Sequence, residues 1–183
     1  MNKTGIFLSD GCEEIEALTV VDTLRRTGLE ITMISINNST SVIGSHGIPF
    51  IADTTFENVN FDEYDAIVLP GGMPGTIHLG EHEGVTSIVK DFFAKGKLVC
   101  AICAAPSVLG AAGILQGRHA TCHPGFEEKL TGAITSTDPV VTDGNVITSR
   151  GMGTSINFAL AIVRYLKDDA AVEELCQKLV YKK

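Results

Sequence analysis

Apolar runs and helical periodicities alternate along the first third of the chain. Residues 4–9 form a short apolar run, and residues 13–28 follow with apolar positions at helical spacing that end at Gly28. Residues 29–36 form a second apolar run. This order predicts a strand, a helix closed by glycine, and another strand. Residues 40–56 alternate between apolar and polar positions and contain Gly and Pro, which predicts a hairpin at a sheet edge.

The same alternation continues through the middle of the chain. Residues 64–72 form a buried-strand pattern that ends in a Pro-Gly-Gly turn, and residues 82–96 form an amphipathic helix pattern that ends at Gly96. Residues 98–103 form another apolar run, and residues 104–113 follow with small residues that predict a short helix.

The C-terminal third adds a hairpin and two helices. Residues 139–149 read as two strands joined by an Asp-Gly turn. Residues 154–167 have a helical pattern, with Thr154 or Ser155 as the expected N-cap. Residues 170–180 predict a final helix.

Apolar strands that alternate with helices predict a mostly parallel sheet covered on both faces. We therefore expect an open α/β/α sandwich of flavodoxin-like type, formed by one domain over residues 1–183. Ligands of such sheets bind beyond the carboxyl ends of the strands. Three loops are expected at that edge: residues 12–16, the Gly71-Gly72 turn, and the turn that holds Cys103.

Composition narrows the possible partners. The formal net charge is −8 and no basic block offsets it, which argues against nucleic acid. The N-terminal apolar run is too short for a signal peptide or a membrane span, so we expect a cytoplasmic protein. An odd number of scattered cysteines argues against a disulfide scaffold; the cysteines are Cys12, Cys100, Cys103, Cys122 and Cys176.

Two of these cysteines, Cys100 and Cys103, are three residues apart and allow three interpretations. On a strand their Cα atoms would be roughly 9–10 Å apart, at about 3.3 Å per residue. That exceeds the ~7 Å limit for a disulfide and argues against a redox pair. A structural zinc site needs a second pair or spaced histidines. The favoured interpretation is a nucleophile at Cys103, with Cys100 as inert core packing.

The residues around Cys103 suit a nucleophile elbow, a sharp turn from strand to helix. Ala104 and Ala105 leave room for the turn, and Pro106 is tolerated in a first helical turn. We expect the helix N-terminus to lower the pKa of Cys103 and favour the thiolate. The backbone N–H groups of Gly72 and Ala104 could form an oxyanion hole. The Gly-Lys-Ser/Thr ending of a phosphate-binding loop is missing.

Three acidic residues begin the first predicted helix. Glu13 and Glu14 are expected in a solvated first turn, where acids suit the helix dipole. Glu16 differs because Val20 and Leu24 continue its face as an apolar stripe. Its carboxyl is therefore expected to point toward the sheet edge, partly desolvated, with a raised pKa.

The histidines give weaker signals. His78 and His82 are four residues apart, but Gly80 lies between them and no third metal ligand is evident, so we expect solvated surface positions. His123 precedes a proline at a turn, where a catalytic imidazole could lie. Spacing alone leaves the role of His123 open.

Five segments taken together resemble the ThiJ/PfpI superfamily, in its branch of deglycases and glutathione-independent glyoxalases. The resemblance follows the whole chain in order. The segments are GCEEIEALTVVDTLRRTG, YDAIVLPGG, VCAICAAPSVL, TCHPGFEEKL and ITSRGMGTSINFALAIV.

The resemblance implies a flavodoxin-like homodimer with no metal or organic cofactor. Cys103 would be the reactive nucleophile, Glu16 its carboxyl partner and His123 the nearby histidine, with Gly72 contributing to an oxyanion hole and the Ala104 N–H beside it. The implied substrates are methylglyoxal, glyoxal and their early adducts with proteins or amino acids, in protection against carbonyl and oxidative stress. The alternative is a non-enzymatic redox sensor or chaperone that acts through oxidation of Cys103.

The sequence departs from the superfamily at three positions. The peptidase-like branch has a histidine directly after the nucleophile, whereas this chain has Ala104, which argues against protease activity. His46 stands where relatives often carry an arginine that reaches across the dimer. Cys100 stands in place of a small residue.

Overall fold

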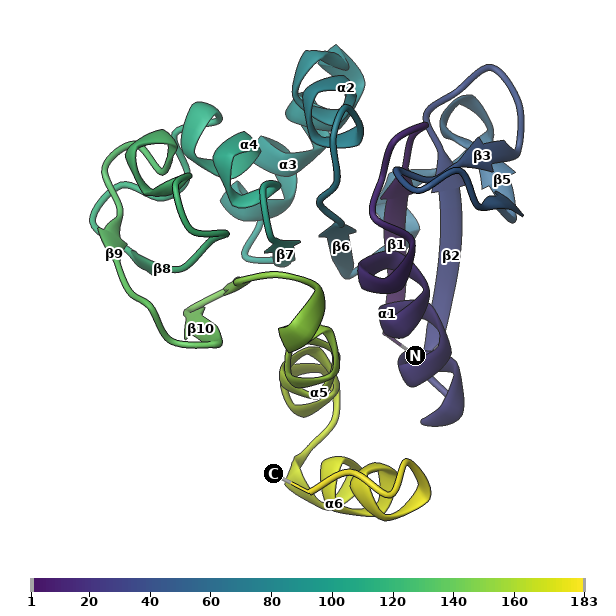
Figure 1. Cartoon of the computed structure of the whole chain (residues 1–183), viewed down its shortest axis with the longest axis vertical. Coiled ribbons are helices and arrows are strands. Elements are labelled where there is room, and N and C mark those ends of the chain that lie inside the picture. Colours follow the sequence, from purple (N-terminus) through teal and green to yellow (C-terminus); the bar gives the residue numbers. More distant parts are fainter. Residues whose placement is uncertain (1, 183) are drawn as a thin grey trace.

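The computed structural model describes residues 2–182 as a seven-stranded sheet with helices on both faces (Figure 1). The strand order is β10-β11-β7-β6-β1-β2-β5, and every neighbouring pair is parallel except β10 and β11. The strands are β1 (Lys3–Leu8), β2 (Glu30–Ser35), β5 (Thr54–Thr55), β6 (Ala66–Leu69), β7 (Leu98–Ile102), β10 (Val140–Asp143) and β11 (Val146–Ser149). This arrangement confirms the predicted flavodoxin-like sandwich.

Six α-helices among the described residues cover the sheet. One core layer joins it to α1, α5 and α6, and the other joins it to α2, α3 and α4. Figure 1 shows these two groups on opposite sides of β6 and β7. The helices are α1 (Glu14–Arg26), α2 (Gly75–Glu81), α3 (Glu83–Ala94), α4 (Pro106–Ala111), α5 (Ser155–Leu166) and α6 (Asp169–Lys178). No helix in the described part of the chain is long and apolar enough to cross a membrane.

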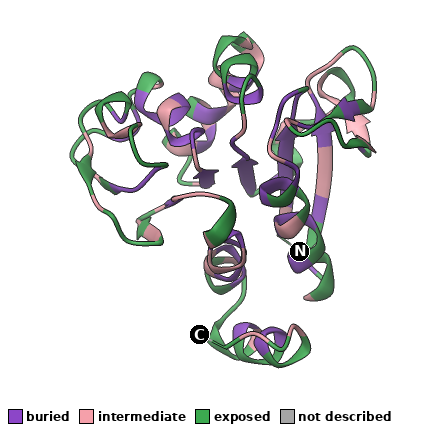
Figure 2. Ribbon diagram, viewed as in Figure 1, coloured by how far each residue is buried: buried purple, intermediate pink, exposed green. Residues whose placement is uncertain are grey.

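The central strands are buried on both faces, which explains their unbroken apolar runs. Every residue of β6 and β7 is buried, and Figure 2 shows these strands in the buried colour while the outer side of α6 is exposed. Alternation is absent because helices cover each face. Glycines close α1 and α3 as predicted, with φ of 73° at Gly28 and 72° at Gly96.

The predicted edge hairpin differs from the observed structure. Strands β3 (Ser41–Ile43) and β4 (Pro49–Ile51) pair only with each other, as a separate two-stranded sheet. The edge of the main sheet is instead β5, which pairs in parallel with β2. A small sheet of β8 (His119–Ala120) and β9 (Ile134–Thr135) was not predicted, because two-residue strands have too few positions to show a pattern.

Two further helix predictions need correction. Helix α2 was missed, because Pro74, Gly75 and Gly80 interrupt its apolar pattern. Thr154 occupies the N-cap position of α5 but caps no helical N–H. Its hydroxyl instead accepts a hydrogen bond from the Gly151 N–H and donates one to the Gly151 carbonyl, which ties down the loop before the helix.

Candidate functional site

Cys103 lies at a sharp turn between β7 and α4. Its φ of 65° places a non-glycine residue in the left-handed region, and neighbouring loops hold it there. The Cys103 N–H donates to the Ser149 carbonyl at 3.0 Å, and its own carbonyl accepts from the His123 N–H at 2.8 Å. Pro106 begins the helix, as predicted. This geometry confirms the expected elbow, which turns the sulfur out beyond the strand end.

Cys103 also differs from the other four cysteines in exposure. All five are free thiols, and Cys103 is partly exposed while the others are buried. Cys100 is completely buried within β7, in agreement with its predicted packing role. Burial raises the pKa of Cys100 well above its usual range.

Glu16 is brought to the same point from the first turn of α1. The residue is fully buried, and its carboxyl lies beside the Cys103 thiol, which lowers the pKa of that carboxyl. Carboxyl Oε2 accepts from the Gly71 N–H at 2.8 Å. The other oxygen, Oε1, has no hydrogen-bond partner among the described residues. The apolar stripe therefore predicted both the direction and the burial of this side chain.

Gly71 makes this contact possible, although the sequence analysis assigned it no role of its own. A Cβ placed on Gly71 would lie 2.6 Å from Cys103 Cβ and 2.8 Å from Glu16 Oε2. A side chain there would push the carboxyl and the sulfur apart. The sequence signal for this role was the position of Gly71, directly after an apolar run and a proline.

Two backbone N–H groups act on the Cys103 sulfur. The N–H groups of Ala104 and Gly72 lower the pKa of its thiol against the effect of burial. Gly72 has φ of 89°, and a Cβ on it would collide with the backbone nitrogen of Glu13. The two groups named for an oxyanion hole in the sequence therefore lie beside this sulfur.

The pKa values of Glu16 and Cys103 correct one expectation from the sequence. Burial raises the pKa of Glu16 to about 7 against the lowering effect of its hydrogen bonds with Cys103 and Gly71. Burial also raises the pKa of Cys103 to about 12, with a further rise from the charge of Glu16. The Ala104 N–H at the helix start lowers the thiol pKa as predicted, but desolvation and the carboxylate outweigh it, so the predicted net fall in that pKa is wrong.

The two groups therefore titrate as a pair. While Glu16 is ionised, the thiol keeps its proton. When Glu16 is protonated, the repulsion disappears and its O–H can donate to a thiolate. A proton moved from sulfur to carboxyl would leave a thiolate beside a neutral carboxyl.

His123 lies near the sulfur, in the loop that follows β8. A Cβ placed on Gly151 would lie 3.6 Å from His123 Cδ2 and 3.9 Å from Cys103 Sγ, so both side chains border this glycine. Nδ1 of His123 donates to the Pro124 carbonyl at 3.0 Å. That bond uses Nδ1 and leaves Nε2 as the other nitrogen of an exposed ring. The structure thus places His123 at the site, which spacing alone had left open.

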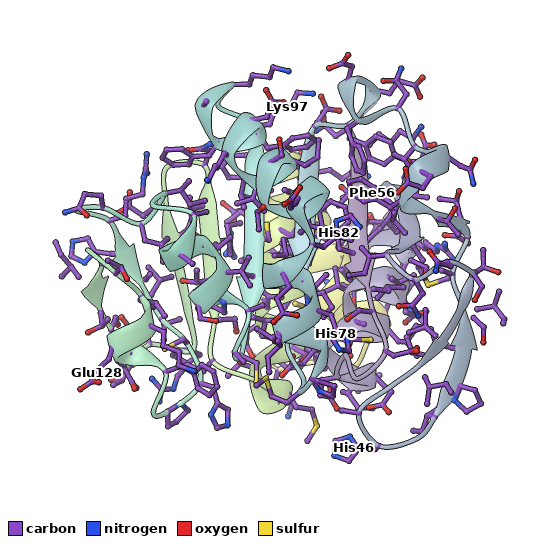
Figure 3. All side chains as sticks on the ribbon, turned by 90° about the horizontal axis from the view of Figure 1, so that it is seen from above. His46, Phe56, His78, His82, Lys97 and Glu128 are labelled. Carbon is purple, nitrogen blue, oxygen red and sulfur yellow. The ribbon has the colours of Figure 1, made fainter. Side chains whose placement is uncertain are left out.

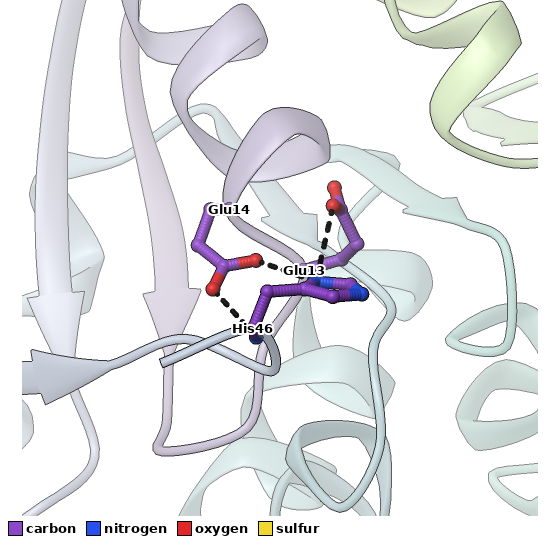
Figure 4. Close-up of side chains that lie close together, drawn as sticks. All are labelled: Glu13, Glu14 and His46. Carbon is purple, nitrogen blue, oxygen red and sulfur yellow. Dashed lines mark hydrogen bonds and ion pairs between the residues drawn. The ribbon is translucent and has the colours of Figure 1, made fainter. Parts of the chain in front are cut away.

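Glu13 and Glu14 are not a solvated first turn. Glu14 is only 2% exposed, and its oxygens accept hydrogen bonds from His46, at 2.8 Å from the backbone N–H and 3.1 Å from Nδ1. Figure 4 shows His46 between the two carboxyl groups. Glu13 caps α1, because its Oε2 accepts from the Glu16 N–H at 2.6 Å. The prediction failed because His46 is 32 residues away along the chain.

The side chains of Glu13, Glu14 and His46 are close enough together to hold a metal ion. One ligand atom from each lies within 4.8 Å of the others. Both oxygens of Glu14 already accept hydrogen bonds from the 45–46 loop, however. We therefore assign the cluster a structural role in fastening that loop to α1.

Three further histidines, His46, His78 and His82, lie at separate places in Figure 3. The Nδ1 of His78 donates to the Asp10 carbonyl at 3.0 Å. His78 is exposed as predicted. His82 is half-buried rather than solvated, because it caps α3 by accepting from the Val85 N–H and packs 4.7 Å from the Phe56 ring centre.

Comparison with known proteins places this site in a family. The model of the DJ-1/PfpI family matches residues 2–165. Protein dj-1beta of Drosophila melanogaster is 36% identical over 177 residues, 96% of this chain and 95% of its own. A protein of Pyrococcus abyssi named a deglycase is 36% identical over 165 residues, 88% of this chain and 98% of its own.

Solved structures agree with the sequence matches. The structure described as Toxoplasma gondii DJ-1, oxidized, has a TM-score of 0.96 and 33% identity, with both chains covered completely. Some relatives are longer, since the chain spans 41% of the DJ-1 homolog B of Arabidopsis thaliana. The family match and the full-length relatives confirm the resemblance seen in the sequence motifs. The chain belongs to the DJ-1/PfpI family.

Proposed function

We propose that the protein is a cysteine-dependent glyoxalase and deglycase. Its substrates would be methylglyoxal, glyoxal and their early adducts with proteins or amino acids. The observation that carries this proposal is the buried Glu16 carboxyl in contact with the Cys103 thiol, under the N–H groups of Gly72 and Ala104. A relative named a deglycase adds support.

The chemistry begins with transfer of the thiol proton of Cys103 to Glu16 and attack of the sulfur on the aldehyde carbon. The new C–S bond turns the aldehyde oxygen into an alkoxide, which accepts hydrogen bonds from Gly72 and Ala104. Protonation gives a thiohemiacetal. Glu16 and His123 then move a proton from the former aldehyde carbon to the neighbouring carbon through an enediol. The resulting thioester is hydrolysed by water, which releases lactate and restores the thiol.

We further infer that the protein is a cytoplasmic homodimer that acts without a metal or organic cofactor; exposed apolar side chains support the dimer. Large apolar side chains are exposed on α1 and the β3–β4 hairpin, including Ile15, Ile43 and Ile51 at 50%, 52% and 64%. Exposed apolar groups gathered on neighbouring elements are typical of interfaces. Analytical ultracentrifugation of the wild type and of an Ile51→Lys variant tests the dimer, since the charge should produce monomers.

The deciding experiment measures methylglyoxal loss together with lactate formation. The wild type should turn over many equivalents, Cys103→Ser should be inactive, and Cys100→Ser should remain nearly as active as the wild type. Stoichiometric loss, or equal loss of activity in both variants, would overturn the proposal.

A redox sensor or chaperone is the second candidate function. Two observations favour it: the partial exposure of the Cys103 thiol, and a structural relative described as oxidized. Limited peroxide should then add two oxygens to Cys103 before any other thiol, as measured by peptide mass spectrometry. Protection of a client protein by the oxidised form, without methylglyoxal turnover, would favour this function over the enzyme.

A further inference from the structure

Two glycines border the Cys103 sulfur, and they differ in what a side chain on each would meet. A Cβ on Gly71 would lie 2.6 Å from Cys103 Cβ, too close for the folded chain to accept. Beyond its chain neighbours, a Cβ on Gly151 would meet nothing closer than 3.6 Å. The φ of Gly151 is 164°, an extended conformation that any residue adopts. The folded chain therefore requires glycine at the first position but not at the second.

The space in front of Gly151 is shared by the reactive groups of the candidate site. Three atoms lie nearest to a Cβ placed there: His123 Cδ2 at 3.6 Å, and Cys103 Sγ and Glu16 Oε1 at 3.9 Å each. Cδ2 is bonded to Nε2, and the Pro124 carbonyl takes up the other ring nitrogen. Glu16 Oε1 is buried and has no hydrogen-bond partner in the described part of the chain. The Cα–H of Gly151 therefore faces the sulfur and both proposed proton carriers.

Hydrogen bonds hold the backbone of Gly151 in place. Its N–H donates to the Thr154 hydroxyl at 3.1 Å, and its carbonyl accepts from that hydroxyl at 2.9 Å and from the Thr154 N–H at 2.8 Å. Two residues earlier, the Ser149 carbonyl accepts from the Cys103 N–H at 3.0 Å. The loop is thus tied to itself and to the elbow, which resists a shift away from the sulfur when a methyl group is added at Gly151.

The proposed reaction places two substrate carbons in this space. The aldehyde carbon bonds to the sulfur. The neighbouring carbon must lie within reach of Glu16 and His123, because the proton moves between the two carbons. That second carbon carries the substituent that distinguishes one 2-oxoaldehyde from another, which is hydrogen in glyoxal, methyl in methylglyoxal and phenyl in phenylglyoxal. The substituent therefore lies against Gly151.

We propose that Gly151 is a specificity-determining residue, whose missing side chain leaves room for the substituent on the second carbon of the substrate. The inference rests on the proposed function and specifies what limits its substrates. A methyl group on Gly151 changes no group that reacts, and its contacts with the site are ordinary van der Waals contacts. Its effect should therefore be a selection of substrates by size.

The kinetic experiment compares Gly151→Ala with Gly153→Ala, the matched control. Gly153 lies in the same loop, is exposed, and would carry a Cβ with nothing within 4 Å. Formation of the 2-hydroxy acid is measured from glyoxal, methylglyoxal and phenylglyoxal. Gly151→Ala should lose about 10–200-fold more kcat/KM on methylglyoxal than on glyoxal, the usual effect of one carbon in a fitted pocket, and more again on phenylglyoxal. Gly153→Ala should keep the wild-type order of the three.

Alkylation of Cys103 tests the same space without turnover. The thiolate displaces chloride from chloroacetone or from 2-chloroacetophenone, and the new C–S bond places a methyl or a phenyl group on the neighbouring carbonyl carbon, as in the substrates. Mass spectrometry of the Cys103 peptide measures both rates. Relative to Gly153→Ala, Gly151→Ala should slow 2-chloroacetophenone about tenfold more than chloroacetone.

The outcomes separate this inference from the proposed function. Equal losses on the three substrates, or equal slowing with the two reagents, would overturn the role of Gly151 alone. Failure of Gly151→Ala to fold would also overturn it, because the added methyl group would then not fit the free site. Absence of turnover in the wild type would overturn the proposed function, and the two alkylation rates would then decide the inference.

Discussion

The first turn of α1 carries two buried carboxyl groups with opposite electrostatic behaviour. Glu14 and Glu16 are 2% and 0% exposed. Burial opposes ionisation of Glu14, but N–H donors from its own backbone, His46 and Ile48 hold its pKa below the usual range. Burial raises the pKa of Glu16 to about 7. Among the described residues, the Gly71 N–H is the one backbone donor to this carboxyl, and Oε1 has no hydrogen-bond partner. The supply of donors, rather than burial, decides which carboxyl keeps its proton.

The difference separates two roles on one helical turn. Glu14 is an ionised anchor for the 45–46 loop. Glu16 is a proton carrier whose charge can change near neutral pH. A buried carboxyl with few hydrogen-bond donors destabilises the fold when it ionises. The presence of such a carboxyl at Glu16 therefore suits a chemical role better than a structural one.

The largest expected effect comes from removing the exchangeable proton of Glu16. Glu16→Gln should lower methylglyoxal turnover by about 10²–10⁴-fold, the usual contribution of acid–base catalysis. The amide can still donate to sulfur, so alkylation of Cys103 should persist. Thiolate absorbance against pH, paired with turnover, measures both. Glu16→Asp should move the carboxylate away from the sulfur and lower the pKa of Cys103, because the charge of Glu16 raises that pKa. Unchanged turnover in Glu16→Gln would reduce Glu16 to a packing residue.

The second prediction concerns stability in the same variant. The folded pKa of Glu16 lies above its unfolded value of 4.5, so its contribution to stability is lost as pH rises from about 4.5 to 7. A shift of this size corresponds to about 3 kcal/mol. The free energy of unfolding of Glu16→Gln relative to the wild type should rise by that amount across the window. Urea denaturation at several pH values measures it, and a flat difference would contradict the raised pKa.

Glu14→Gln should have the opposite effect on stability. Loss of hydrogen bonds to an ionised carboxylate should cost about 1–3 kcal/mol above pH 4.5, and less at lower pH as the wild-type carboxylate becomes protonated. Turnover should change little. Faster hydrogen exchange of the His46 amide would report a loosened loop. If stability is unchanged at neutral pH, the anchor role of Glu14 is wrong.

The smallest expected effect tests the influence of the Glu13 charge on the pKa of Glu16. The negative charge of Glu13 adds to the raised pKa of Glu16, with a smaller effect than that of burial. Glu13→Gln keeps an oxygen that can accept the Glu16 N–H, so α1 should stay capped while the pKa of Glu16 falls by a fraction of a unit. A carboxyl NMR titration detects this change. A rise in that pKa would show that the cap, rather than the charge, controls Glu16.

The sequence by itself determined the elements that depend on local pattern. Unbroken apolar runs located β1, β6 and β7, and glycines located the ends of α1 and α3. Small residues and a proline after Cys103 indicated the elbow, and the stripe through Val20 and Leu24 pointed Glu16 inward. These features depend on periodicity and on backbone conformations that neighbouring residues dictate.

Only the tertiary structure decided the electrostatics of the site. The partner of Glu14 comes from 32 residues away, and the Gly71 N–H reaches Glu16 across 55 residues. The same packing partly desolvated the Cys103 thiol and raised its pKa, against the expectation drawn from its helix. Desolvation and hydrogen bonding depend on groups that folding brings together, so local sequence placed the reactive residues but left their proton affinities to the assembled fold.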